Sequence, residues 1–281
     1  VFYFIILIKF MHERETQLSE APIGKLLLKL SAPAMIGMFV MALYNLVDTI
    51  FVGRAVGVLG IAAVAIVFPI NMLIMAIEQT IGIGGASFIS RKLGERKIKE
   101  TEIAFGNIIS LTVISSIILS VLGLLFLKSL LVAFGATENI LPLAIEYGRI
   151  IIFGVFFFSF GMVGNTIVRS EGNAKVAMIT MLIGALFNLI LDPILIFGLD
   201  WGIAGAAWAT VFSQIITALF ILFYFIFGDS ILKFYWRNLR LRFYIVKEIV
   251  AIGFSSFVRM GAGSVGAIVL NNSLAFYGGD L

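Results

Sequence analysis

The chain has 281 residues, of which 61% are hydrophobic and only 13% are charged, with a net charge of +4. Soluble domains carry about 45–50% apolar and about 25% charged residues, so this composition excludes a soluble enzyme, a nucleic-acid-binding protein and a secreted disulfide scaffold. The absence of cysteine excludes disulfides and thiolate metal sites, and the single histidine, His12, cannot form a histidine-rich site. We therefore predict an all-α polytopic membrane protein, surrounded by lipid, that is not an enzyme, binds no nucleic acid and needs no cofactor.

The first 29 residues are expected to form a cytoplasmic N-terminus. Val1–Phe10 is apolar but too short to span a bilayer, and it lacks a cleavage site of signal-peptide type. Met11 opens a polar run of the kind found at cytoplasmic N-termini. We predict that Met11 is the native start, with Val1 as the alternative.

Seven apolar blocks follow, each reaching or exceeding the roughly 20 residues that a membrane-spanning helix needs. Helix is the expected structure, because backbone groups in lipid must be hydrogen-bonded within their own segment. The second block is long enough to be tilted or broken, at Pro69 or at the Gly82–Gly85 cluster. The predicted spans are 30–52, 59–89, 103–127, 148–168, 176–199, 203–227 and 249–270.

The distribution of basic residues predicts the orientation in the cell membrane, plasma or inner. Sixteen of the 20 Lys and Arg residues lie in the N-terminal stretch and in the loops after the second, fourth and sixth spans. The alternate loops hold only Arg54 and Lys128. Because cytoplasmic loops carry the excess of Lys and Arg, the N-terminus is predicted to be cytoplasmic.

Four polar side chains are expected to meet inside the membrane. A buried carboxylate costs at least about 2.5–3.5 kcal/mol on insertion scales, so Asp48 and Asp192 are informative. At 1.5 Å per residue both lie about 24–27 Å above the cytoplasmic face. Asn188 is one helical turn from Asp192, and Thr210 of the sixth span returns to the same level. These hard oxygen ligands suit Na⁺ or a proton.

Two points stay open at this stage. Polar side chains in a bundle also hydrogen-bond neighbouring helices without any further function, and for Thr210 the two interpretations are balanced. Glu78 lies lower in its span than the Asp48–Asp192 pair. It is interpreted either as a polar residue of an inward-facing cavity or as a water-exposed carboxylate beside the glycine cluster.

The end of the chain restarts the pattern of its beginning. A basic cytoplasmic linker, 228–248, precedes a seventh span that enters from the same side as the first. Two six-span halves related by an axis along the membrane normal are a common transporter plan. We therefore predict a six-helix N-lobe at 30–227, and at 249–281 the first helix of a truncated C-lobe, which together make half of a twelve-helix, two-lobe transporter. A second lobe or a dimer partner would complete it.

Several motifs resemble the multidrug and toxic compound extrusion (MATE) transporters. They occur in order along the chain and cover essentially residues 25–281, which makes the resemblance more specific than any single motif. The motifs are Lys29-Leu-Ser-Ala-Pro33, Asn45-Leu-Val-Asp48 with Phe51-Val-Gly53, Gly84-Gly-Ala-Ser87 with Ser90-Arg-Lys-Leu-Gly94, Asn165 with Arg169-Ser-Glu-Gly172, Asn188-Leu-Ile-Leu-Asp192-Pro193, and Gly202-Ile-Ala-Gly-Ala-Ala-Trp-Ala-Thr210.

The resemblance implies a cation-coupled antiporter, using Na⁺ or H⁺, that exports cationic or amphipathic drugs and toxic compounds by alternating access. It also implies that Asp48, Asn188, Asp192 and Thr210 hold the coupling ion in the N-lobe. The seventh span lacks the glutamate that some branches carry, which favours coupling in the N-lobe, and Glu78 departs from the family pattern. The alternatives are a flippase of a lipid-linked precursor, which would need more intramembrane basic residues than Arg259, and a truncated inactive fragment.

Overall fold

The computed structural model describes residues 23–278. The choice between Met11 and Val1, the position of His12 and most of the predicted cytoplasmic N-terminus lie outside the described residues. The described part is helical along almost its whole length. Its elements are α2 (Ile23–Val56), α3 (Val58–Gly94), α4 (Ile98–Ala133), α5 (Leu141–Phe153), α6 (Val155–Ser170), α7 (Ala174–Pro193), η1 (Ile194–Gly198), α8 (Gly202–Phe227), η2 (Trp236–Leu239) and α9 (Phe243–Gly278).

The apolar helices match the predicted spans, with one break in an unexpected place. Within residues 23–278, six helices are long and apolar enough to cross a membrane, and a seventh span results if α5 and α6 count together. These two helices are bent by 53° at Gly154, whereas α3 continues without interruption through Pro69 and the glycine cluster. Gly154 lies against α8, where an added Cβ would stand 2.7 Å from Val211 Cγ2. The broken span is therefore the fourth and not the second.

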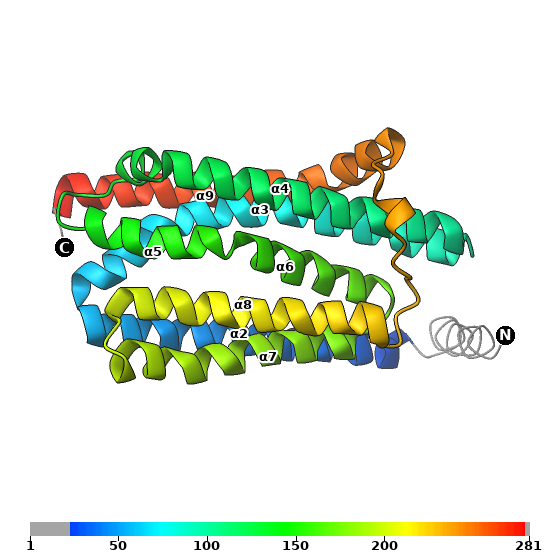
Figure 1. Ribbon diagram of the computed structural model, residues 1–281, viewed down its shortest axis with the longest axis horizontal. Coiled ribbons are helices and arrows are strands. Elements are labelled where there is room, and N and C mark those ends of the chain that lie inside the picture. Colours follow the sequence, from blue (N-terminus) through cyan, green and yellow to red (C-terminus); the bar gives the residue numbers. More distant parts are fainter. Residues whose placement is uncertain (1–22, 279–281) are drawn as a thin grey trace.

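The helices form three layers (Figure 1). On one side lie α2, α7 and α8, which pack against one another, and on the other side lie α3, α4 and α9. The bent pair runs between them: α6 contacts both α3 and α8, and α5 contacts both α4 and α8. Each half of this span therefore contacts both layers.

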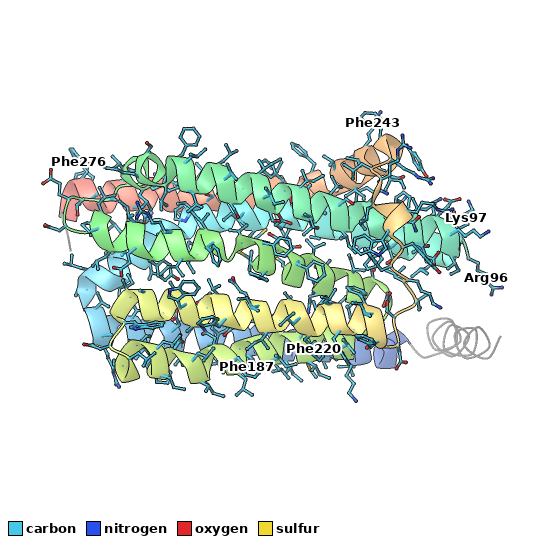
Figure 2. The ribbon with its side chains drawn as sticks, in the orientation of Figure 1. Arg96, Lys97, Phe187, Phe220, Phe243 and Phe276 are labelled. Carbon is cyan, nitrogen blue, oxygen red and sulfur yellow. The ribbon has the colours of Figure 1, made fainter. Side chains whose placement is uncertain are left out.

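Two buried clusters of apolar side chains hold the layers together. One contains Val67, Leu131 and Ile152, and the other contains Phe105 and Ile108. Outside the bundle, large apolar side chains such as Phe187 and Phe243 stand exposed, while Arg96 and Lys97 lie at the end that carries the α3–α4 turn (Figure 2). An apolar outer surface with charged ends is what a lipid bilayer requires.

Close backbone contact joins α9 to α3. A Cβ on Gly84 would overlap the carbonyl of Ile249, and one on Gly253 would overlap the carbonyl of Thr80. Further along the same seam, Ser264 Oγ donates a hydrogen bond to the carbonyl of Pro69 (3.1 Å). The glycine cluster of α3 therefore serves close helix packing.

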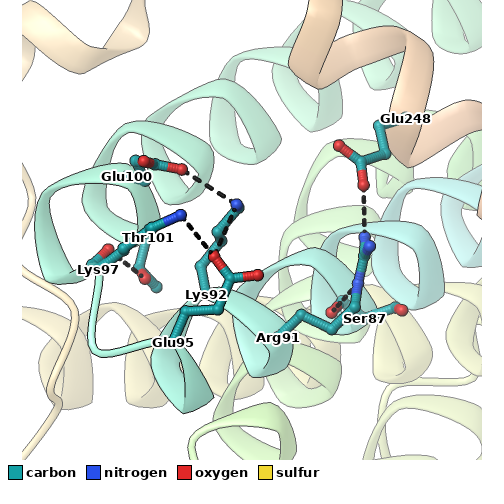
Figure 3. Close-up of polar contacts among 8 residues, drawn as sticks. All are labelled: Ser87, Arg91, Lys92, Glu95, Lys97, Glu100, Thr101 and Glu248. Atoms are coloured by element: carbon teal, nitrogen blue, oxygen red, sulfur yellow. Dashed lines mark hydrogen bonds and ion pairs between the residues drawn. The ribbon is translucent and has the colours of Figure 1, made fainter.

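Ion pairs cluster at the basic end of α3 (Figure 3). Arg91 contacts Glu248 of α9 at 2.6 Å, and Lys92 and Lys97 contact Glu95 at 3.0 and 2.9 Å. The hydrogen bonds from Lys97 and Lys92 lower the pKa of Glu95 to about 2. Exposed pairs of this kind contribute little to stability. They surround the tight turn between α3 and α4, in which Arg96 adopts a φ of 59°.

The linker between α8 and α9 is bound to α4. Asn107 Nδ2 donates to the carbonyl of Asn238 (3.2 Å), and Asn107 Oδ1 accepts from the backbone N–H of Arg242 (2.6 Å). Ser110 Oγ donates to the carbonyl of Leu239 (2.7 Å). These contacts hold the linker as far as Arg242, and α9 begins directly after it at Phe243, earlier than the predicted start at Ile249.

We expect Asn107→Ala to release this linker. The substitution removes the donor and the acceptor that hold it, and each net hydrogen bond is worth about 0.5–1.5 kcal/mol. Trypsin should then cleave after Arg237 or Arg240 several-fold faster, as followed by mass spectrometry of the purified protein. Asn45→Ala is the matched control, because the Asn45 amide bonds to Met41 of its own helix. Equal cleavage rates in both variants would contradict the assignment.

Candidate cation site and cavity

Three of the four predicted site residues are joined by hydrogen bonds, one within α7 and one from α7 to α8. Asn188 Nδ2 donates to Asp192 Oδ1 (3.4 Å) and to Thr210 Oγ1 (3.5 Å). Asn188 and Asp192 lie one turn apart on α7 and are 2% and 0% exposed. The i, i+4 spacing that placed both on one helix face also turns both toward α8.

Asp48 reaches the same site from α2. This helix packs along α7, and the carboxylates of Asp48 and Asp192 interact electrostatically. Asp48 is partly buried. The structure therefore brings Asp48, Asn188, Asp192 and Thr210 together where α2, α7 and α8 meet.

The site is rich in acceptors that lack donors. Asp48 Oδ1, Asn188 Oδ1 and Asp192 Oδ2 are buried, and none has a hydrogen-bond partner within the described part of the chain. Buried polar atoms are usually paired, so three unpaired oxygens on neighbouring side chains need an explanation. Carboxylate, amide and hydroxyl oxygens suit a hard cation, and the donor set fits Na⁺ or a proton.

A change of helix type follows the site directly. The regular α7 ends at Pro193, which has no N–H to donate, and continues as the π-helical turn η1. Its wider winding is closed by the N–H of Leu199, which donates to the carbonyl of Ile194 (2.9 Å). Such turns occur frequently at functional sites.

Two tyrosines that the sequence pattern did not single out lie near this site. Tyr44 and Tyr147 both interact electrostatically with Asp48 and Asp192. Tyr44 lies one turn before Asp48 on α2, so the i, i+4 spacing would have revealed it. Tyr147 lies on α5, just before the predicted start of the fourth span at Gly148. Their phenol hydroxyls are polar groups that can reorient when the charge of the carboxylates changes.

A cavity of about 320 Å³ adjoins the site. Asn188, Thr210 and Tyr44 line it, together with Met and Phe side chains, and Arg169 is the one basic residue among the described residues of its lining. Met side chains are flexible and polarizable, which suits ligands of varied shape. The Met and Phe residues of the lining are Met38, Met41, Met75, Met162, Met181, Phe157 and Phe158.

Glu78 lies outside this cavity and outside the cation site. Glu78 is 0% exposed, so it is not a water-exposed carboxylate, and it is not among the lining residues of this cavity. Its role as a cavity residue stays a prediction. Its neighbours Met75 and Gln79 line the cavity instead. One residue along a helix turns the side chain by about 100°, and the sequence alone did not show which face of α3 points to the cavity.

Comparisons with known proteins identify the family. The family model MatE matches residues 33–194, more than half of the chain. The chain belongs to the MatE family. The match runs from Pro33, within α2, to Ile194, just after α7, and so contains three of the four site residues. Members of this family are transporters and not enzymes.

Relatives within the MatE family are named for the transport of different compounds. An FAD transporter of Shewanella oneidensis is 35% identical over 210 residues, which are 73% of this chain and 46% of that protein. The multidrug export protein MepA of Staphylococcus haemolyticus is 31% identical over 262 residues, covering 92% of this chain and 57% of MepA. The chain thus spans about half the length of these relatives.

Solved MATE structures share the fold. The MATE multidrug transporter DinF-BH, solved with a bound ligand, superposes with a TM-score of 0.88 at 45% identity, over 93% of this chain and 58% of that one. A MOP superfamily transporter from Pyrococcus furiosus, for which a reversed polarity of the binding pocket suggests a different function, gives 0.85 at 35% identity, over 94% and 58%. The all-helical membrane fold is therefore that of MATE transporters.

Proposed function

We propose that this chain is the coupling part of a cation-driven antiporter that exports cationic or amphipathic drug-like compounds. On this proposal it supplies a six-helix lobe and the first helix of a second lobe, with the N-terminus in the cytoplasm and the helices in the cell membrane. The observation that carries the proposal is the set of three unpaired oxygens of Asp48, Asn188 and Asp192, seen within residues 23–278, beside a 320 Å³ cavity.

The geometry supports coupling between ion and substrate. Asn188 and Thr210 belong both to the cation site and to the cavity lining. A Na⁺ ion or proton at Asp48 and Asp192 would remove negative charge next to the cavity, which weakens attraction for a cationic substrate. An ion drives alternating access only if it binds the two conformations with different affinity. Because Asn188 and Thr210 belong to both sites, a movement of the cavity wall would also change the affinity for the ion.

The cavity favours an amphipathic substrate. Its apolar lining provides surface for aromatic rings, and the two carboxylates just beyond it provide negative charge. MepA and DinF-BH, both named for multidrug transport, support this choice. Arg169 in the lining and the FAD transporter relative favour a second candidate, an anionic nucleotide-like substrate.

The decisive experiment is ion-driven efflux of ethidium. Cells would express this chain, either alone or joined to the second lobe of DinF-BH, and efflux would be followed after an imposed Na⁺ or pH gradient. We expect efflux that stops when an ionophore collapses the driving gradient. Efflux from the joined protein, with none from the chain expressed by itself, would mean that this lobe and its cation site need a second lobe for transport.

Three outcomes would replace the proposal. Transport of FAD with no movement of ethidium would establish the nucleotide-like substrate. Movement of neither, combined with scrambling of a lipid-linked precursor in vesicles, would establish the flippase alternative. A joined protein that is inserted in the membrane but transports nothing would indicate an inactive fragment.

A further inference from the structure

A second buried carboxylate lies at the centre of the other helix layer. Glu78 of α3 falls between Ile74, which belongs to one apolar cluster, and Ile81, which belongs to the other. It is 0% exposed. Ser115 of α4 and Ser159 of α6 lie next to it, so three helices enclose the group.

The hydrogen bonds around Glu78 do not suit an ionised carboxylate. Ser115 Oγ lies 2.8 Å from Glu78 Oε1 and 3.1 Å from the carbonyl of Thr112, but a serine has only one proton for these two acceptors. The hydroxyl of Ser159, which is 0% exposed, lies beside the same carboxyl, but neither it nor Glu78 Oε2 makes a hydrogen bond of good geometry among residues 23–278. An ionised group in this position would share its donor with a backbone carbonyl.

A protonated carboxyl resolves this arrangement. With the proton on Oε1, Glu78 donates to Ser115 Oγ, and the proton of Ser115 goes to the carbonyl of Thr112. Both short contacts then become hydrogen bonds at the same time, and no net charge is buried. The heavy-atom positions stay the same in the two descriptions.

No charged side chain in the described part of the chain compensates an ionised Glu78. The electrostatic contacts of its carboxyl among residues 23–278 are limited to the two serines. An isolated charge in a low-dielectric interior is among the most costly groups to bury. The ionisable groups on the described parts of the helices packed against α3 that make no such contact are Tyr44, Asp48 and Arg54 (α2), Lys99, Glu100, Glu102 and Lys128 (α4), Glu146, Tyr147 and Arg149 (α5), Arg169 (α6), and Tyr244, Lys247, Glu248, Arg259 and Tyr277 (α9).

We propose that Glu78, with Ser115 and Ser159, forms a second proton-binding site in this lobe, separate from the Asp48–Asp192 site. A proton fits better than Na⁺, because a metal cation needs several converging oxygens. Among the described residues, only Glu78 Oε2 and Ser159 Oγ are free to serve here. The proton links α3 to α4 through Ser115, whereas the other site links α2, α7 and α8.

Infrared spectroscopy of the purified full chain in lipid tests the site directly. A protonated carboxyl has a C=O stretch that is distinct from carboxylate bands and shifts in D₂O. We expect Glu78→Gln to remove one such band at neutral pH, while Glu138→Gln, which changes an exposed glutamate, removes none. Asp192→Asn should leave the Glu78 band in place, because the two sites are separate. The band is measured without a transport assay, so this test does not depend on efflux.

Ser115→Ala and the addition of Na⁺ provide two further tests of the site. If Glu78→Gln does not accumulate, Ser115→Ala should retain the acid band but shift it, because the carboxyl loses its hydrogen-bond partner. An unchanged spectrum in both variants, or only carboxylate bands in the wild type, would overturn the proposal. Loss of the Glu78 band on adding Na⁺ at constant pH would overturn the proton as occupant.

Discussion

Asp192→Asn should abolish gradient-driven efflux while the protein stays folded in the membrane. Asparagine keeps the shape of the side chain and an oxygen that can accept the hydrogen bond from Asn188 Nδ2. It removes one of the two negative charges that would hold the coupling cation. A change of about 1.4 kcal/mol in cation affinity is already tenfold, so the driven rate should fall by at least about tenfold.

The measurement is ethidium efflux after an imposed Na⁺ or pH gradient, in the protein joined to the second lobe of DinF-BH. Membrane insertion would be quantified in the same cells. Asp200→Asn is the matched control, because Asp200 is exposed in the turn between η1 and α8. Its φ of 55° is one that asparagine tolerates well. Full driven efflux in Asp192→Asn would refute the coupling role of Asp192.

The positions of the site residues followed from simple helix geometry. Asp48, Asp192 and Thr210 were placed at one level by counting residues from the membrane faces, and Asn188 by its i, i+4 spacing from Asp192. The method works because a membrane-spanning helix has a fixed rise per residue and must start near a known plane. The electrostatic and hydrogen-bond contacts among these four residues agree with that count.

Rotation and bending of the helices could not be obtained in the same way. The hydropathy of α3 is almost uniform around its circumference, so the sequence did not show that Glu78 points away from the cavity. The bend falls at Gly154, where the chain lies against Val211 of α8, and this contact is distant in sequence. The docking of the linker depends on two polar side chains of α4, Asn107 and Ser110, whose partners are distant in sequence.

Gly84→Ala should strongly destabilise the protein through the α3–α9 seam. The added Cβ would overlap the carbonyl oxygen of Ile249, which is backbone and cannot rotate away. The two helices would have to separate, and Gly253, which lies against the carbonyl of Thr80, would lose its close contact as well. Overpacking of this kind typically costs about 1–3 kcal/mol, and a clash with rigid backbone should lie at the upper end.

The check is the thermal stability of the purified protein in detergent, compared with Gly94→Ala. Gly94 ends the same helix, and an added Cβ there meets no described atom within 4 Å, so this control should match the wild type. Gly253→Ala should be destabilised as Gly84→Ala is. The double variant should lose less than the sum of the two, because once the seam has opened the second methyl group meets no further resistance. Wild-type stability in Gly84→Ala would mean that α9 does not pack on α3 at this distance.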